Sequence, residues 1–162
     1  MKKVLTAFLV CLLALSVFSC GETAQTAEDV SLYELSRSML SADEFPEMVT
    51  VSSSDKDAKD NFLFLFDVDY DLTDGYFLSY AKEGSAYELA VIKVADEGSA
   101  GEVEDSLARH VAGRVNLYKN YSPSDLPLAK SAEIGSVGKY CYLILCRDTA
   151  AVRAAMLDMI KG

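Results

Sequence analysis

Apolar residues recur at the spacing of a helix in three segments, residues 31–41, 99–118 and 148–160. Apolar side chains three or four positions apart lie on one face of a helix, which can then pack on a core. The stripes are Leu32, Leu35 and Met39 in the first segment, Val103, Leu107, Val111 and Val115 in the second, and Val152, Ala155, Met156, Met159 and Ile160 in the third. The pattern predicts three amphipathic helices.

Polar residues at the starts of these segments predict where the helices begin. Ser31 and Glu34 have the spacing of a capping box, and Ser99 and Glu102 repeat that spacing before the second segment. Asp148 stands where an N-cap residue is expected before the third segment.

Four shorter segments have the composition of β-strands. Residues 87–94 and 139–147 are apolar on both faces, which is typical of central strands in a sheet covered on both sides. Residues 131–137 precede the second of these across Gly138, so the pair predicts an antiparallel hairpin. Residues 47–51 are expected to form a further short strand.

Three segments between these elements have weaker patterns. Residues 62–66 are an aromatic, apolar run too short to separate a strand from a buried helix. Residues 71–80 have an acidic start and predict a short helix, and residues 122–125 predict a turn or a helix start. Together the elements predict an α+β fold: a single small, mostly antiparallel sheet of three to four strands packed by two to three helices, in one domain over residues 29–162.

The first twenty residues have the pattern of an exported lipoprotein. Lys2 and Lys3 precede an uncharged, mostly apolar run over residues 4–18. As a helix this run would extend about 22 Å, short of the roughly 30 Å hydrocarbon core, which favours a signal peptide over a membrane span. The run ends before Cys20 in a pattern that resembles a lipobox, with Phe18 where a small residue is usual.

We therefore expect a lipoprotein signal peptide at residues 1–19, and a lipid-bearing (palmitate) Cys20 with a polar tether at residues 20–28. Two acyl chains hold a protein stably on a bilayer, whereas one holds it only marginally. The expected location is the extracytoplasmic face of the cell membrane. The alternatives are an ordinary secretory signal cleaved elsewhere and an uncleaved anchor.

The net charge of the chain limits the classes of partner that we expect it to bind. The formal net charge is -10 at pH 7, and it becomes -12 once Lys2 and Lys3 are removed with the signal. Such a charge repels nucleic-acid phosphates and anionic lipid headgroups. We expect no nucleic-acid partner, a membrane contact through the lipid alone, and either an envelope protein or a small ligand as partner.

Several segments in order carry a resemblance. They are Tyr-Glu-Leu-Ala-Val-Ile-Lys-Val at residues 87–94, Glu-Val-Glu-Asp-Ser-Leu in the long helix, Tyr-Ser-Pro at residues 121–123, and Gly-Lys-Tyr-Cys-Tyr-Leu-Ile-Leu at residues 138–145. Over residues 30–160 the chain resembles a family of small bacterial lipoproteins classified as a domain of unknown function. The resemblance implies a lipoprotein and one compact domain, and it supplies no catalytic residue.

Cysteine and histidine do not form a recognisable site in the sequence. Cys141 and Cys146 lie five residues apart on one predicted strand, so they face opposite sides about 16 Å apart, too far for a disulfide. We expect two buried, reduced thiols. His110 lies in the long helix one turn from Arg114, with no Gly-x-Ser-x-Gly elbow in the chain, and is expected at the boundary of the core.

Alternating carboxylates form the most suggestive local motif, and they are Asp67, Asp69, Asp71 and Asp74. An EF-hand loop needs Gly at its sixth position and Glu at its twelfth, where this chain has Leu72 and Leu78. The sequence therefore excludes an EF-hand and assigns no metal or cofactor. A weak calcium site at these aspartates is an alternative to helix capping and solvation.

Two function classes follow. The favoured one is a non-catalytic binding or interaction module of the cell envelope, since no residue pattern nominates a catalytic group. The alternative is an extracytoplasmic hydrolase that uses paired carboxylates, and whether the chain is an enzyme stays open at this point. Glu88 and Glu133 are the acids to examine, because both lie in predicted strands where a carboxylate needs a reason.

Overall fold

The computed structural model describes residues 29–161 of the chain. In this range the α-helices are α2 (Leu32–Leu40), α3 (Ala58–Leu65), α4 (Ala100–Tyr121), α5 (Leu126–Lys130) and α6 (Thr149–Lys161). The strands are β1 (Met48–Ser52), β2 (Thr73–Ala81), β3 (Glu88–Val94), β4 (Glu133–Val137) and β5 (Tyr140–Leu145). Single 3-10 turns lie at Tyr70–Leu72 and Glu97–Ser99. The predicted signal peptide, Cys20 and tether lie outside these residues.

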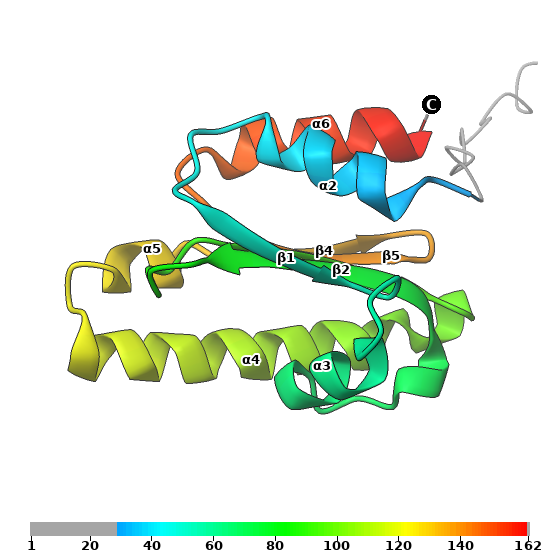
Figure 1. Cartoon of the computed structure of the whole chain (residues 1–162), viewed down its shortest axis with the longest axis horizontal. Coiled ribbons are helices and arrows are strands. Elements are labelled where there is room, and N and C mark those ends of the chain that lie inside the picture. Colours follow the sequence, from blue (N-terminus) through cyan, green and yellow to red (C-terminus); the bar gives the residue numbers. More distant parts are fainter. Residues whose placement is uncertain (1–28, 162) are drawn as a thin grey trace, which may run out of the picture.

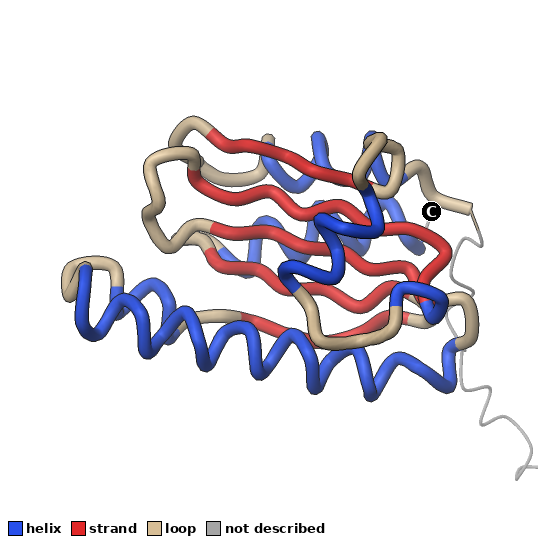
Figure 2. The backbone as a smooth tube through the Cα atoms, turned by 60° about the horizontal axis from the view of Figure 1, so that its bottom comes forward, coloured by secondary structure: helices blue, strands red, loops and turns tan. Residues whose placement is uncertain are grey.

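The strands form one sheet with the order β1-β2-β3-β5-β4, and every neighbouring pair is antiparallel. Helices cover both faces, with α2 and α6 on one and α3 and α4 on the other (Figure 1). Figure 2 shows α3 crossing in front of the sheet and α4 running along its lower side in this view. The α+β class and the single antiparallel sheet are confirmed. The predicted count was too low, because the described part has five strands and five α-helices instead of three to four strands and two to three helices.

The missing strand is β2, where the helix predicted over residues 71–80 was wrong. Its Tyr76, Phe77 and Leu78 are all buried, so both faces of the strand are apolar and the alternation that identifies a half-exposed strand is absent. The acidic start belongs to the preceding 3-10 turn, where the Asp69 side chain accepts from Asp71 N. The undecided run over residues 62–66 contributes to α3.

The N-terminal caps predicted from the sequence are present at two of the three helices. Ser31 caps α2 by accepting a hydrogen bond from Glu34 N, and Asp148 accepts from Ala151 N at the start of α6. The capping box at Ser99 was wrong, because Ser99 makes no side-chain cap bond. Asp96 instead accepts from Gly98 N in the turn before α4. Within residues 29–161, no helix has the length and apolar character needed to cross a membrane.

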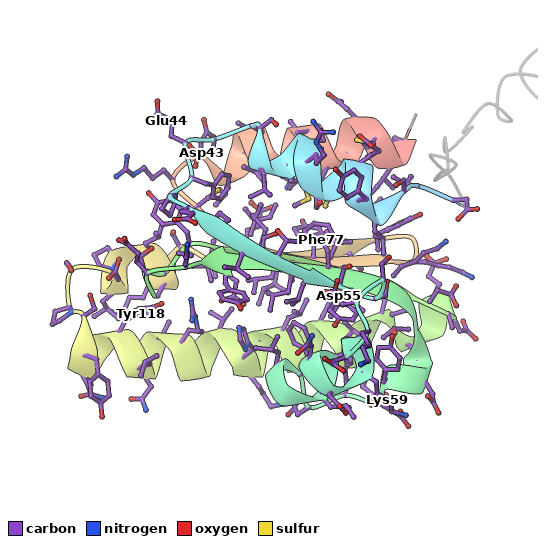
Figure 3. The ribbon with its side chains drawn as sticks, in the orientation of Figure 1. Asp43, Glu44, Asp55, Lys59, Phe77 and Tyr118 are labelled. Carbon is purple, nitrogen blue, oxygen red and sulfur yellow. The ribbon has the colours of Figure 1, made fainter. Side chains whose placement is uncertain are left out.

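Each face of the sheet has its own core. On one side, Leu35 and Met39 of α2 and Met156 of α6 pack on side chains such as Phe77. On the other, residues of α3 and α4 such as Phe62 and Leu107 pack against the sheet. Figure 3 shows Phe77 on the α2 and α6 side and Tyr118 between α4 and the sheet. As predicted, β3 divides its side chains between the two cores.

Candidate functional site

A pocket of about 430 Å³ opens on the face covered by α3 and α4. Both helices lie on that face of the sheet (Figure 1), and α3 is only 8 residues long against 22 for α4. Five elements supply the lining, which consists of Val51 from β1, Asn61 and Leu65 from α3, Leu78 and Tyr80 from β2, Glu88 from β3, and His110 and Arg114 from α4. Its volume is in the range of ligand pockets, roughly 300–1,000 Å³.

A buried carboxylate lies at the base of this pocket. Glu88 is 2% exposed, and its Oε1 lies 2.6 Å from His110 Nε2. Its Oε2 lies 3.0 Å from Arg114 Nε. His110 and Arg114 are one helical turn apart, so they share a face of α4 and reach the same carboxylate. Burying an isolated carboxylate is very costly, and the two partners offset that cost.

The two contacts of Glu88 differ in kind. A carboxylate only accepts hydrogen bonds, so His110 donates to Glu88 through Nε2. The contact with Arg114 is an ion pair by distance but not a hydrogen bond by angle. Glu88 Oε2 and Arg114 Nε therefore have no hydrogen-bond partner within the described residues. Buried polar atoms in this state are uncommon and mark a site whose hydrogen bonding is incomplete.

Neighbouring side chains hold the imidazole and the guanidinium in place. The Phe66 ring packs against His110 with 5.6 Å between centroids. Arg114 lies over the Tyr118 ring at 5.1 Å. The Tyr118 hydroxyl donates to the carbonyl oxygens of Gly84 and Ser85, which ties α4 to the β2–β3 turn, and burial raises its pKa.

The second acid of interest, Glu133, lies elsewhere. Glu88 is paired with Leu145 across β3 and β5, on the face of α3 and α4. Glu133 is paired with Ile144 across β4 and β5, on the opposite face. There it contacts Arg153 at 3.1 Å and accepts from the Tyr142 hydroxyl at 3.3 Å. Cross-strand partners share a face, so the two glutamates do not form a carboxylate pair.

The four aspartates of the proposed calcium motif make separate contacts. Asp67 accepts twice from Arg109, at 2.6 and 3.0 Å, and these hydrogen bonds lower its pKa to about 2. Asp69 caps the 3-10 turn, Asp71 lies 3.7 Å from Lys59, and Asp74 is exposed on β2. Across residues 29–161, no group of three or more His, Cys, Asp or Glu side chains is arranged to hold a metal ion. This part of the chain therefore offers calcium no assembled site.

Both core cysteines are buried and unpaired, as the sequence predicts. Cys141 belongs to the core under α3 and α4, and Cys146 to the core under α2 and α6. Burial raises the pKa of each thiol to about 12. Since the thiolate is the reactive form, neither side chain is an activated nucleophile at neutral pH.

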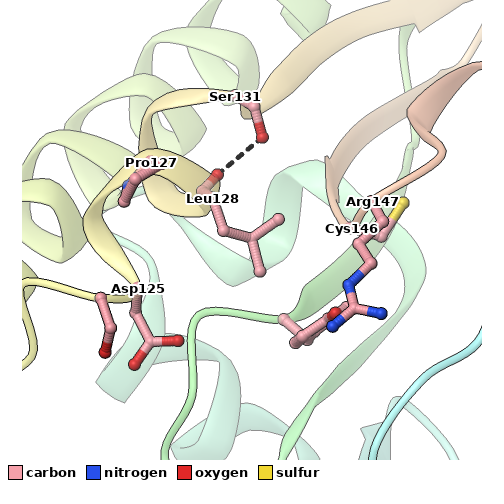
Figure 4. Close-up of a pocket in the computed structure, with 8 residues that line it drawn as sticks. Asp125, Pro127, Leu128, Ser131, Cys146 and Arg147 are labelled. Carbon is pink, nitrogen blue, oxygen red and sulfur yellow. Dashed lines mark hydrogen bonds between the residues drawn. The ribbon is translucent and has the colours of Figure 1, made fainter.

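A second hollow, also of about 430 Å³, lies between α5 and the end of β5 (Figure 4). Asp125 and Arg147 lie on opposite sides of it, with Leu128 between them in this view. Ser131 Oγ donates to Leu128 O, and Ser122 Oγ donates to Asp125, so these polar groups already have partners. Among the described residues that line this hollow, Asp125 and Arg147 are the charged ones and neither is buried. The hollow is therefore a weaker candidate than the Glu88 pocket.

The sequence named Glu88, His110 and Arg114 separately but did not bring them together. His110 lies at the edge of the core as predicted, but it is the partner of Glu88 and not only a packing residue. The usable signals were an acid on a central strand and a histidine one turn from an arginine. Their meeting depends on how α4 lies across β3, which no spacing in the sequence encodes.

The comparisons with known proteins place this geometry in a family. A family model described as a domain of unknown function (DUF4358) matches residues 47–146. The matched range includes the whole sheet, α3, α4 and α5, and therefore every lining residue of the Glu88 pocket. Neither the search of curated proteins nor the search of solved structures gave a match. The match confirms the prediction of a domain of unknown function: this chain belongs to the DUF4358 family.

Proposed function

We propose that the protein is a bacterial envelope lipoprotein, anchored through Cys20, whose domain binds a small ligand without chemical conversion. The anchor is supported by Lys2 and Lys3, the apolar run over residues 4–18 and the cysteine that follows it. The net charge of -10 is consistent with a membrane contact made by the lipid rather than by the protein surface.

The observation that carries ligand binding is the composition of the Glu88 pocket. Its walls are largely apolar, and three charged or titratable side chains converge at one end. Apolar walls with a few placed polar groups are the usual construction of small-molecule sites. The unpartnered Glu88 Oε2 and Arg114 Nε add a reason for the site to accept a further group.

Hydrolysis by paired carboxylates has less support than binding. Among the described residues, the pocket lining contains one carboxylate, Glu88, and Glu133 lies on the other face of the sheet. The described lining also contains no serine, threonine or cysteine to serve as a nucleophile beside His110. A binding module is therefore the function that this arrangement supports best.

A pocket-filling substitution tests the binding function. Leu65→Trp places an indole at the wall of the pocket, whereas Leu63→Trp changes an exposed residue of the same helix. We expect ligand-observed NMR with hexanoate, 1-hexanol, hexylamine and norleucine to detect binding of at least one probe to the wild type and to L63W. The same probe should not bind L65W. Equal behaviour of all three proteins would contradict a ligand site in this pocket.

The anchor has its own test. Intact-mass analysis of the protein extracted from membranes should give a mature chain that begins at Cys20 and carries the mass of its lipid. A mature chain that begins elsewhere, or one without lipid mass, would remove the lipoprotein assignment. It would leave the ligand site untouched.

A further inference from the structure

Arg114, Asn61 and Tyr80 give the Glu88 pocket hydrogen-bond donors that a ligand can reach. Glu88 itself is 2% exposed and lies behind His110 and Arg114, whose side chains keep 15% and 21% exposure. Asn61 and Tyr80 also line the pocket, and each carries a donor. A ligand that enters the pocket therefore meets a guanidinium, an imidazole, an amide and a phenol before it meets the carboxylate.

The guanidinium sets the charge that the ligand should carry. Arg114 is the one lysine or arginine among the described lining residues, and its planar fork suits a carboxylate. Its Nε faces Glu88 without a proper hydrogen bond, and one Nη reaches the Ser85 carbonyl only at 3.4 Å. The donor capacity of this side chain is therefore poorly used by the protein.

The aliphatic wall of the pocket favours an apolar chain on the ligand. Val51, Leu65 and Leu78 present aliphatic surface from three different elements. Burial of apolar surface is favourable by roughly 25 cal/mol per Å², so an apolar chain against these residues adds affinity without a directional contact.

We infer that the Glu88 pocket is selective for a small organic carboxylate with an apolar chain. The carboxylate binds Arg114, and the chain lies against Val51, Leu65 and Leu78. This inference rests on the proposed function, because it names the ligand class of the same pocket. Glu88 is then a positioning residue, which holds the guanidinium for the ligand.

The test compares hexanoate with 1-hexanol and hexylamine, which share an apolar chain and differ in head group. Calorimetry on the purified full chain should show hexanoate binding roughly tenfold more tightly than 1-hexanol, as expected for a charge-assisted hydrogen bond, and hexylamine most weakly.

Two arginine variants test whether the preference for hexanoate depends on Arg114. Arg114→Gln should reduce hexanoate affinity to that of 1-hexanol, whereas Arg109→Gln, on the exposed side of the same helix, should leave both affinities unchanged. If R114Q does not fold, the head-group series on the wild type still decides. Equal binding of hexanoate and 1-hexanol, or preference for hexylamine, overturns the carboxylate but keeps the ligand site. Failure of every probe to distinguish the wild type from L65W overturns both.

Discussion

The two faces of the sheet differ in how completely their helices close them. The face under α2 and α6 is closed by fully buried apolar side chains such as Leu35, Met39 and Met156. The face under α3 and α4 also has an apolar core, but it leaves a pocket around a buried carboxylate. The family match covers the second face completely and includes neither α2 nor α6. The comparison indicates that the family match includes the face with the pocket and leaves out the helices that close the other face.

The largest effect should come from removing the carboxylate of the open face. Glu88→Ala leaves Arg114 and His110 without their buried partner, and such losses destabilise proteins by about 3–5 kcal/mol. Glu133→Ala removes a partly exposed contact with Arg153 on the other face, and we expect it to cost about 1 kcal/mol or less. Urea unfolding of both variants provides the comparison.

The Glu133→Ala variant is the control for Glu88→Ala. Both are strand residues, so strand propensity changes alike in the two variants. Equal losses of stability would mean that Glu88 is not specially held and would weaken the distinction between the faces.

Truncated leucines test how tightly each face is packed. Leu35 is fully buried under α2, and Leu35→Ala should cost about 3 kcal/mol, because it removes apolar contacts and leaves a cavity. Leu65 borders a pocket and is half-buried, so Leu65→Ala should cost about 1 kcal/mol. Thermal or denaturant unfolding measures both, and the reverse order would show that the pocket wall is the better packed region.

A smaller effect is expected where α6 begins on the closed face. Asp43 accepts hydrogen bonds from the backbone N–H groups of Arg147 and Asp148. Figure 3 shows it at that end of the molecule. Burial alone would raise the pKa of Asp43, but hydrogen bonds from Asp148 and Glu44 N–H outweigh burial and lower it. Asp43→Ala should cost about 1 kcal/mol at neutral pH, as for the loss of a helix cap.

The pH dependence follows from the sign of that shift. A lowered folded-state pKa stabilises the protein above the unfolded value of about 4, and the contribution disappears as pH falls through the folded value. The wild type and D43A should therefore converge in stability below about pH 4. Asp67, on the open side, has a pKa of about 2 and should lose its contribution in a similar window, between about pH 4 and 2. A D43A difference that persists at low pH would contradict a role for the ionised carboxylate.

The smallest expected difference concerns the thiols, because both faces bury one. Cys141 and Cys146 each have a pKa raised to about 12 by burial, so both should react slowly with a maleimide in the native protein. Peptide mapping after timed labelling assigns the rate to each residue, and urea should accelerate both. Faster labelling of Cys141 alone would show that the open face admits small reagents to its core.

Much of the fold could be predicted, because amphipathic helices carry their own signal. The stripes in α2, α4 and α6 are buried or partly buried, and β3, β5 and the hairpin around Gly138 have the expected places. That turn needs a positive φ, and Gly138 has φ 54°. The strand β2 was missed because helices cover both its faces and remove the two-residue period.

The site was harder to predict for a different reason. Glu88 was identified as an acid in a central strand, where a buried charge requires compensation. Its partners come from α4, and the contact depends on the packing of that helix over the sheet. A charge that must be paired can be inferred from one strand, but the identity of its partner requires the tertiary structure.

The order of the strands has a consequence for how the molecule folds. The neighbours β2 and β3 are joined by a short turn, and so are β4 and β5, so each hairpin can form early from local contacts. The pairing of β3 with β5 must wait for chain segments that include α4 and α5, because these lie between them in the sequence. Glu88 lies at the end of the pairing between β3 and β5, opposite Leu145. We therefore expect the carboxylate to leave water only when the two halves of the sheet join, which makes Glu88 a reporter of the last step of assembly.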